Sequence, residues 1–273
     1  MNEFIGLRGR VWFKALAGEA SSIEGDPPSV LVADALIDGE KARFLCVVPD
    51  SNGRFPRARR GEVGLEEAYA LAARVREVID ADTAGKKRPI IAIVDLKSQA
   101  YGRREEIAGL HLAAAAAVDA YVTARLAGHP IIALIVGQAI SGGFLTHGYQ
   151  ANRLLAFDDD GVLIHAMHKE AAARVTRRTV AQLDKLAATV PPLSYDVRDY
   201  SKLGLLYKLL HVVNPENPTQ AEISLVRGEL IQAIQDARKG SRDLRTRIDS
   251  EGALIARKAS RLARARVEEQ WKQ

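Results

Sequence analysis

Ser141, Gly142 and Gly143 lie where an apolar run gives way to a helical pattern, in the stretch IVGQAISGGFLTHGYQANRLLAF. Each glycine costs a helix about 1 kcal/mol relative to alanine, so a pair at a helix start needs a reason. The first turn of a helix has N–H groups without helical partners and the positive end of the peptide dipoles. Glycine lets a carbonyl or carboxylate oxygen approach those donors, which is the chemistry of an oxyanion hole. The alternative is that the pair only allows tight packing of helix against sheet.

A second junction of the same kind occurs earlier, at Ala100, Tyr101 and Gly102, which follow the buried run PIIAIVDL. The carboxyl ends of parallel strands meet at one edge of a sheet. We therefore expect the two junctions to lie side by side and to form an anion-stabilising cleft. Neither junction has a Walker lysine or a GxGxxG pattern, so a nucleotide site is not indicated.

Titratable side chains near the glycine pair extend this chemistry. His147, His165 and His168 follow it, and any one of them could donate a proton to a reacting substrate atom. A histidine satisfied structurally within the core is the alternative for each. Lys169 and Arg153 could pair with an anionic group of a substrate, and ordinary solvated charge is the alternative for both.

Ser141 can also be interpreted as a nucleophile, because His165 follows it after 24 residues in the context LIHAM. A serine at a helix start beside an accessible histidine suits acyl transfer. The stretch GQAISGGFL resembles the serine turn of Clp-type proteases, which share this order of serine and histidine. The sequence does not specify a third member of a triad; Asp184 and Asp199 are the available carboxylates.

The elements that must position these residues alternate in type. Apolar runs at 42–50, 86–96 and 129–137 predict strands, and helical periodicity at 65–81 and 104–126 predicts the helices between them. Strand, loop and helix thus recur, which indicates α/β layering with right-handed crossovers. Two short strands are expected in RLLAF and GVLIHAM. Further helices are expected at 170–188, 219–237 and 250–271, with a break at Pro191 and Pro192.

Charge is distributed unevenly along the 273 residues. The net charge is +5, and residues 238–273 alone carry eleven Lys and Arg against five Asp and Glu. This surplus is either a solvated helix face or a docking surface for an anionic partner. Aromatic residues are not interleaved with the basic ones, which argues against nucleic acid.

The remaining composition is that of an ordinary globular protein, with 47% hydrophobic and 27% charged residues. Cys46 is the single cysteine and lies in the apolar run RFLCVV, so we expect a buried thiol. No signal-like N-terminus and no run of about 18 apolar residues occurs. We therefore expect a cytoplasmic protein without a membrane span.

Two long segments resemble a known family. The first segment is VPDSNGRFPRARRGEVGLEEA, and the second is AIVDLKSQAYGRREEIAGLHLAAAAAVDAYVTARLAGHPIIALIVGQAISGGFLTHGYQANRLLAF. Both resemble sequences of the crotonase-like carboxyltransferase fold. More narrowly, they resemble the gamma-subunit family of biotin-independent malonate decarboxylases, over the chain to about residue 235. The resemblance implies an α/β, crotonase (ClpP)-like stacked-sheet spiral with surrounding helices. We assign residues 1–237 to this domain and 238–273 to a basic C-terminal helical extension.

The resemblance also implies an activity and partners. The chain would pair with a homologous beta subunit and work with an acyl carrier protein and an acyltransferase subunit. The pair would decarboxylate a malonyl thioester to an acetyl thioester on the carrier. The thioester arm, a CoA-derived prosthetic group, would be supplied by the carrier, with no metal and no cofactor bound covalently to this chain.

The family's site residues can be carried over to matching positions. Gly142 and Gly143 would supply backbone donors, and Ser141 would position their turn. The residues expected to contact substrate are Ala100, Tyr101, Gly102, His147 and His168, and His165 is a candidate catalytic group. The earlier junction reads SQAYG, not the TPGA pattern of biotin-dependent relatives, which fits an enzyme that no longer binds biotin. The alternatives are a Clp-like serine protease and a non-catalytic scaffold partner.

Overall fold

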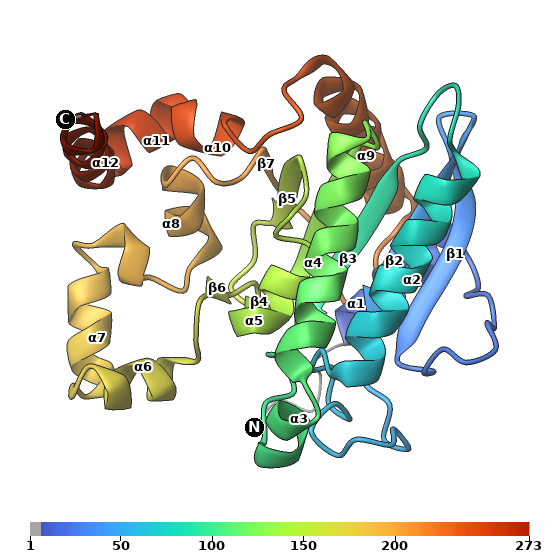
Figure 1. Ribbon diagram of the computed structural model, residues 1–273, viewed down its shortest axis with the longest axis horizontal. Coiled ribbons are helices and arrows are strands. Elements are labelled where there is room, and N and C mark those ends of the chain that lie inside the picture. Colours follow the sequence, from blue (N-terminus) through green and yellow to red (C-terminus); the bar gives the residue numbers. More distant parts are fainter. Residues whose placement is uncertain (1–6, 273) are drawn as a thin grey trace.

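One mixed sheet runs through the protein, and the computed structural model describes residues 7–272 (Figure 1). The strand order is β1-β2-β3-β4-β5-β7, and the short β6 pairs with the end of β4. β1 and β2 form an antiparallel hairpin, and the other pairings are parallel. The strands are β1 (Val30–Ile37), β2 (Glu40–Val47), β3 (Ile90–Leu96), β4 (Ile131–Ile140), β5 (Arg153–Phe157), β6 (Ile164–His165) and β7 (Lys208–Leu210).

Helices cover both faces of this sheet. α2 and α4 lie side by side in front of it, whereas α1 and α9 pack behind it (Figure 1). The helices of this main body are α1 (Leu7–Ala17), α2 (Leu65–Ala81), α3 (Arg103–Ile107), α4 (Leu110–Leu126), α5 (Ser141–Thr146) and α9 (Gln220–Lys239). This layering of helices on a largely parallel sheet confirms the predicted α/β class.

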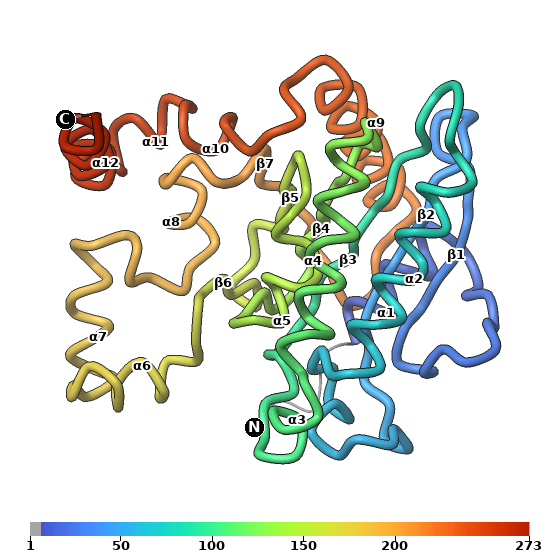
Figure 2. The backbone as a smooth tube through the Cα atoms, in the orientation of Figure 1, coloured from blue at the N-terminus to red at the C-terminus, as the bar shows by residue number. Residues whose placement is uncertain are grey.

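Short helices form a second group at one side of the sheet, and Figure 2 shows the backbone passing through them between β6 and β7 and again after α9. They are α6 (Lys169–Val175), α7 (Val180–Ala187), a 3₁₀ turn (Pro191–Leu193), α8 (Val197–Lys202), α10 (Thr246–Asp249), α11 (Glu251–Ala256) and α12 (Lys258–Trp271). The C-terminal extension is thus helical. Its expected boundary at residue 238 stays a prediction, and α9 continues to Lys239.

The core lies where the parallel strands are buried on both faces. Every residue of β3 is buried, and so is every residue of β4 except Gln138. Such strands appear in the sequence as continuous apolar runs because neither face meets water. Behind them, the Trp12 ring meets Phe157 edge-on at 4.7 Å. Cys46 is buried as expected, and burial raises the pKa of its thiol, which keeps it unreactive.

Three predicted helices are interrupted in the structure. The helix expected at 104–126 divides at Gly109, whose φ of 92° lies in the left-handed region. The helix expected at 170–188 divides near Arg177, at φ 54°, and restarts where the Thr179 hydroxyl caps α7. The helix expected at 250–271 divides at Arg257. Helical periodicity continues across each break, so the sequence pattern concealed them.

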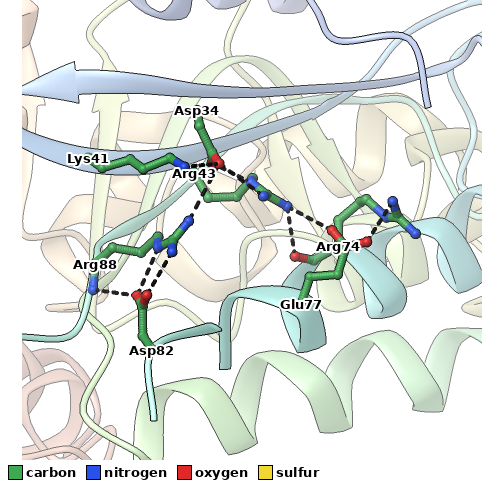
Figure 3. A network of polar contacts seen from close by, with 7 residues as sticks. All are labelled: Asp34, Lys41, Arg43, Arg74, Glu77, Asp82 and Arg88. Atoms are coloured by element: carbon green, nitrogen blue, oxygen red, sulfur yellow. Dashed lines mark hydrogen bonds and ion pairs between the residues drawn. The ribbon is translucent and has the colours of Figure 1, made fainter. Parts of the chain in front are cut away.

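A network of seven charged residues joins the β1–β2 hairpin to α2 and to the loop before β3 (Figure 3). Its members are Asp34, Lys41, Arg43, Arg74, Glu77, Asp82 and Arg88. Arg43 is central: its Nε donates to Asp34 at 2.6 Å and its Nη1 to the Arg74 carbonyl at 3.0 Å. Burial would raise the pKa of Asp34, but Arg43 and Lys41 outweigh it and hold that pKa below its ordinary value. The network therefore fixes the edge hairpin through charge-assisted hydrogen bonds.

The hydropathy of the described helices bears on whether any of them could span a membrane. Over residues 7–272, no helix combines the length and apolar character needed to cross a bilayer.

Candidate active site

The glycine pair lies at the turn between β4 and α5. β4 ends at Ile140, and Ser141 begins α5 with φ 62°, in the left-handed region that a non-glycine residue seldom adopts. One turn later, Thr146 Oγ1 donates to the Gly142 carbonyl at 2.7 Å. A serine held in this conformation stores strain, which is typical of functional turns.

The loop after β3 lies directly against this turn. A Cβ atom on Gly143 would be 2.4 Å from the Ser98 carbonyl oxygen, so only glycine allows the approach. The Gly142 N–H donates to Gln99 Oε1 at 2.9 Å. Tight packing is therefore one reason why residue 143 is glycine, and the α5 turn packs here against a loop and not against a sheet. The donor of Gly142 already holds an amide carbonyl oxygen, the kind of atom that an oxyanion hole binds.

The earlier junction contributes to this contact through other residues than expected. The Ala100 N–H donates to the Val63 carbonyl at 2.8 Å, and the Tyr101 N–H donates to the Gln99 carbonyl at 2.9 Å. Both donors are therefore used by backbone carbonyls, one in the segment before α2 and one in the loop itself. Gly102 has extended backbone (φ −178°) and precedes α3. Ser98 and Gln99 form the wall that meets the glycine pair. The sequence signal that could have identified Ser98 and Gln99 is the polar run KSQ, which directly follows a buried strand.

A cavity of about 350 Å³ opens beside the α5 turn. The parallel pairing of β4 with β6 places Ile140 opposite His165, which brings Ser141 and His165 to the same cavity. The other lining residues are mostly apolar: Phe144, Leu145, Tyr149, Ile164, Ala166, Pro191, Pro192, Leu193, Ser194, Tyr200, Leu203 and Leu205. An apolar cavity with few polar groups is the usual form of a small-molecule site.

His165 is half-buried in the wall of this cavity. Its ring stacks on Tyr195 with centroids 3.9 Å apart, and its Nδ1 lies 3.1 Å from the Met167 carbonyl oxygen. Burial, together with the positive charge of Lys169, lowers the pKa of His165. The imidazole is therefore mainly neutral at pH 7, and its protonated form is a stronger acid than an ordinary histidine.

The other two candidate histidines do not line this cavity. His147 is fully buried; its Nδ1 lies 2.9 Å from the Tyr121 hydroxyl and its Nε2 lies 3.1 Å from the Ile93 carbonyl. Burial lowers the pKa of His147 to about 4. Its expected contact with substrate is wrong for this geometry, because no face of the ring is open. His168 precedes α6 as its N-cap and is absent from the cavity wall.

The charges suggested for a protease triad or for the departing carboxylate are engaged elsewhere. Lys169 pairs with Asp184 at 2.7 Å, and Asp199 pairs with Lys202 at 2.6 Å. Arg153 forms an ion pair with Asp236. Among residues 7–272, no carboxylate is hydrogen-bonded to His165, and Ser141 makes no hydrogen bond to it. The structure thus brings serine and histidine together without assembling a triad.

Metal chemistry has no obvious location in the described part of the chain. Between residues 7 and 272, no group of three or more His, Cys, Asp or Glu side chains is placed to hold an ion.

Comparison with known proteins gives one consistent family. A family model described as malonate decarboxylase gamma subunit (MdcE) matches residues 58–271. The malonyl-S-ACP:biotin-protein carboxyltransferase MADD of Malonomonas rubra is 33% identical over 257 residues, covering 92% of this chain and 85% of its own.

Solved structures agree over nearly the whole length. A chain in a Pseudomonas malonate decarboxylase hetero-tetramer in complex with coenzyme A is 53% identical, with a TM-score of 0.90, covering 95% of this chain and 99% of its own. A chain in a Pseudomonas MdcD-MdcE hetero-dimer is 54% identical, with a TM-score of 0.87, covering 97% and 99%. Transcarboxylase 12S, at 16% identity, a TM-score of 0.62 and coverage of 85% of this chain and 40% of its own, shares the fold, which is therefore carboxyltransferase-like. Because the family model matches residues 58–271 and the Malonomonas relative is 33% identical over 92% of this chain, the chain belongs to the malonate decarboxylase gamma-subunit family.

Proposed function

We propose that this chain pairs with a homologous beta subunit to decarboxylate a malonyl thioester carried on an acyl carrier protein. The product would be the acetyl thioester on the same arm. The hetero-dimeric and hetero-tetrameric assemblies of the Pseudomonas relatives support the pairing, and the malonyl-S-ACP named for the Malonomonas relative supports the substrate. An acyltransferase subunit would load the carrier.

The observation that carries this proposal is the contact between Gly142 and Gln99. Loss of CO2 from a malonyl group leaves an enolate whose negative charge falls on the thioester oxygen. A backbone N–H aimed at that oxygen lowers the barrier by roughly 3 kcal/mol. The Gly142 N–H binds a neutral carbonyl oxygen, Gln99 Oε1, at 2.9 Å. In the proposed reaction, the Gln99 amide moves aside and the thioester oxygen takes its place, with Gly143 as the neighbouring donor.

Protonation of the enolate carbon completes the reaction. His165 is the histidine that lines the cavity, so it is our candidate proton donor in preference to His147 and His168. The lowered pKa makes the imidazolium of His165 a stronger acid but leaves only a minor fraction protonated at pH 7, so each turnover must be followed by reprotonation from solvent. The apolar wall of the cavity suits the uncharged end of a thioester arm, which would arrive on the carrier. Ser141, held in its strained turn, would position the donors.

The experiment is reconstitution. The chain is incubated with malonyl-loaded carrier protein, alone and with the homologous beta subunit, and CO2 and the acyl group on the carrier are measured. Activity only in the mixture, with acetyl-carrier equal to CO2 and no requirement for biotin, is the expected result. Release of CO2 that depends on a biotin protein would indicate carboxyl transfer instead. Equal activity of the beta subunit without this chain would show that this chain has no catalytic role and serves at most as a scaffold.

A serine hydrolase is a second candidate, because Ser141 combines a strained backbone with a position beside His165. A fluorophosphonate probe distinguishes the two. Stoichiometric labelling of Ser141 that is lost in Ser141→Ala would support a nucleophile and contradict the decarboxylase role of this turn. We expect no labelling, since no carboxylate orients the histidine within residues 7–272.

A further inference from the structure

A second cavity, of about 330 Å³, lies between the C-terminal helices and the end of the sheet. Arg153 of β5 and Arg247 of α10 both line it, although their exposed fractions are only 6% and 5%. Thr246 and Ser250 add hydroxyl groups to the wall, and Asp236 adds the one carboxylate, which the ion pair with Arg153 neutralises. Leu205 lines both this cavity and the one beside α5, so the two are neighbours. Two buried arginines on one cavity call for an explanation.

Arg247 carries a buried charge without a carboxylate partner. Its Nη1 donates to the Tyr149 carbonyl at 2.7 Å and its Nη2 donates to the Ala151 carbonyl, whereas its Nε has no hydrogen-bond partner. No Asp or Glu within residues 7–272 forms an ion pair with it. A guanidinium has five N–H donors, so two carbonyls leave capacity for an anion.

Further positive charge surrounds Arg247. Arg153 has an anionic partner in Asp236, but Arg125 is buried without an acidic side chain in hydrogen-bonding distance and donates only to the Arg242 carbonyl, at 3.0 Å. Burial lowers the pKa of Arg247 to about 10, with Arg125 and Arg153 contributing, so the group is still charged at neutral pH. Burying a charge is costly unless an opposite charge or hydrogen bonds compensate. Here the compensation is incomplete.

We propose that this cavity binds an oxyanion of the phosphate or carboxylate type, held by Arg247 and Arg153. Arginine forks match the paired oxygens of such groups. The bound anion would join α10 to β5 and so fix the C-terminal helices to the sheet. This site is separate from the α5 turn and does not depend on the decarboxylase proposal.

Calorimetry and thermal unfolding of the full chain test this site. Inorganic phosphate and malonate are titrated separately at constant ionic strength, with chloride as the balancing anion. We expect saturable binding and a saturable rise in Tm with at least one of them, and the one that acts identifies the source of the oxyanion. A response to neither, beyond that of chloride, would overturn the proposal.

Three variants separate anion binding from simple anchoring. Arg247→Met is expected to weaken binding at least tenfold, whereas Arg245→Ala, which removes a neighbouring exposed arginine, should leave the affinity unchanged. If Arg247→Met does not fold, Arg247→Lys keeps the charge but loses the planar fork, and should bind several-fold more weakly. Unchanged affinity in the folded Arg247 variant would mean that this arginine only anchors α10, and it would contradict the proposed anion site.

Discussion

At the scale of single residues, Gln99 decides how the glycine pair can work. Its amide oxygen occupies the Gly142 N–H, and it belongs to the loop that forces Gly143 to be glycine. A substitution at Gly143 would therefore disturb the Ser98 backbone and confuse folding with catalysis. Gln99 offers a cleaner test because its side chain alone carries the contact.

Gln99→Ala should free the Gly142 donor and lower KM for the malonyl carrier several-fold while leaving kcat near the wild-type value. Gln99→Glu should raise KM by roughly tenfold, since a carboxylate competes more strongly for an N–H donor. Steady-state kinetics of the reconstituted pair measure both. The same KM in the two variants would show that substrate oxygen does not replace Gln99.

His147 predicts an acid-dependent loss of stability. The unfolded chain binds a proton at this residue below about pH 6.5, whereas the folded protein resists protonation down to about pH 4. The stabilisation is complete above pH 6.5 and is lost as the pH falls through that window, by roughly 3 kcal/mol at 1.36 kcal/mol per pKa unit. Denaturant unfolding at several pH values measures it. In His147→Gln the loss over this range should be smaller, and an unchanged pH dependence would contradict the assignment.

At the scale of elements, the charged network and Asp95 follow one rule: different segments of the chain are joined by a few largely buried polar contacts. Arg43 joins β2 to β1 and α2 (Figure 3). Asp95, at 3% exposure in β3, accepts from the Gly9 and Gln138 N–H groups and so joins α1 to β4 just before the active-site turn. The Arg43 contacts fix the start of β3, opposite Ile90, whereas the Asp95 contacts hold the carboxyl ends of β3 and β4, where the candidate site lies.

Arg43→Met should lower the free energy of unfolding by about 2 kcal/mol, because Asp34 and the Arg74 carbonyl lose a buried charged donor. The matched control is Arg76→Met. Arg76 pairs with Asp119 in the open, at side-chain exposures of 49% and 68%, and its loss should change stability by no more than about 0.5 kcal/mol. Equal effects of the two variants in urea unfolding would show that the network adds nothing beyond a surface ion pair.

At the scale of the whole molecule, the last helix, α12, stands apart from the sheet (Figure 1). α12 has no buried residue, and Val267 and Trp271 are exposed along it. A 14-residue helix with no buried residue is marginal in water on its own, so we expect a partner surface to stabilise it. The basic surplus of residues 238–273 favours an acidic partner such as the carrier protein.

Deleting residues 257–273 should leave the unfolding free energy of the remainder within about 1 kcal/mol of wild type, since α12 has no buried residue and loses only partly exposed hydrogen bonds of Arg257 and Arg261. It should weaken carrier or beta-subunit binding at low salt, with less difference at high salt. Binding measured at two ionic strengths checks this, and unaltered affinity at both would make α12 a solvated helix.

Much of the fold could be predicted from the sequence because its signals are local. The apolar runs of β3 and β4 and the periodicity of α2 need no tertiary information. α1 and β1 were not predicted, since Trp12 and its neighbours gain their stability from packing against distant segments. The divisions at Gly109 and Arg177 depend on backbone conformations that periodicity does not report.

For the site, the sequence by itself determined the chemistry on offer: a serine–glycine–glycine turn after a buried strand, a histidine 24 residues later and a basic C-terminal segment. Only the tertiary structure decided which groups meet. It set Gln99 against Gly142, enclosed His147 in the core, placed His165 on the cavity and brought Arg153 and Arg247 to another. The physical reason is that composition and periodicity act along the chain, whereas hydrogen-bond occupancy, burial and charge pairing arise between segments that only folding brings together.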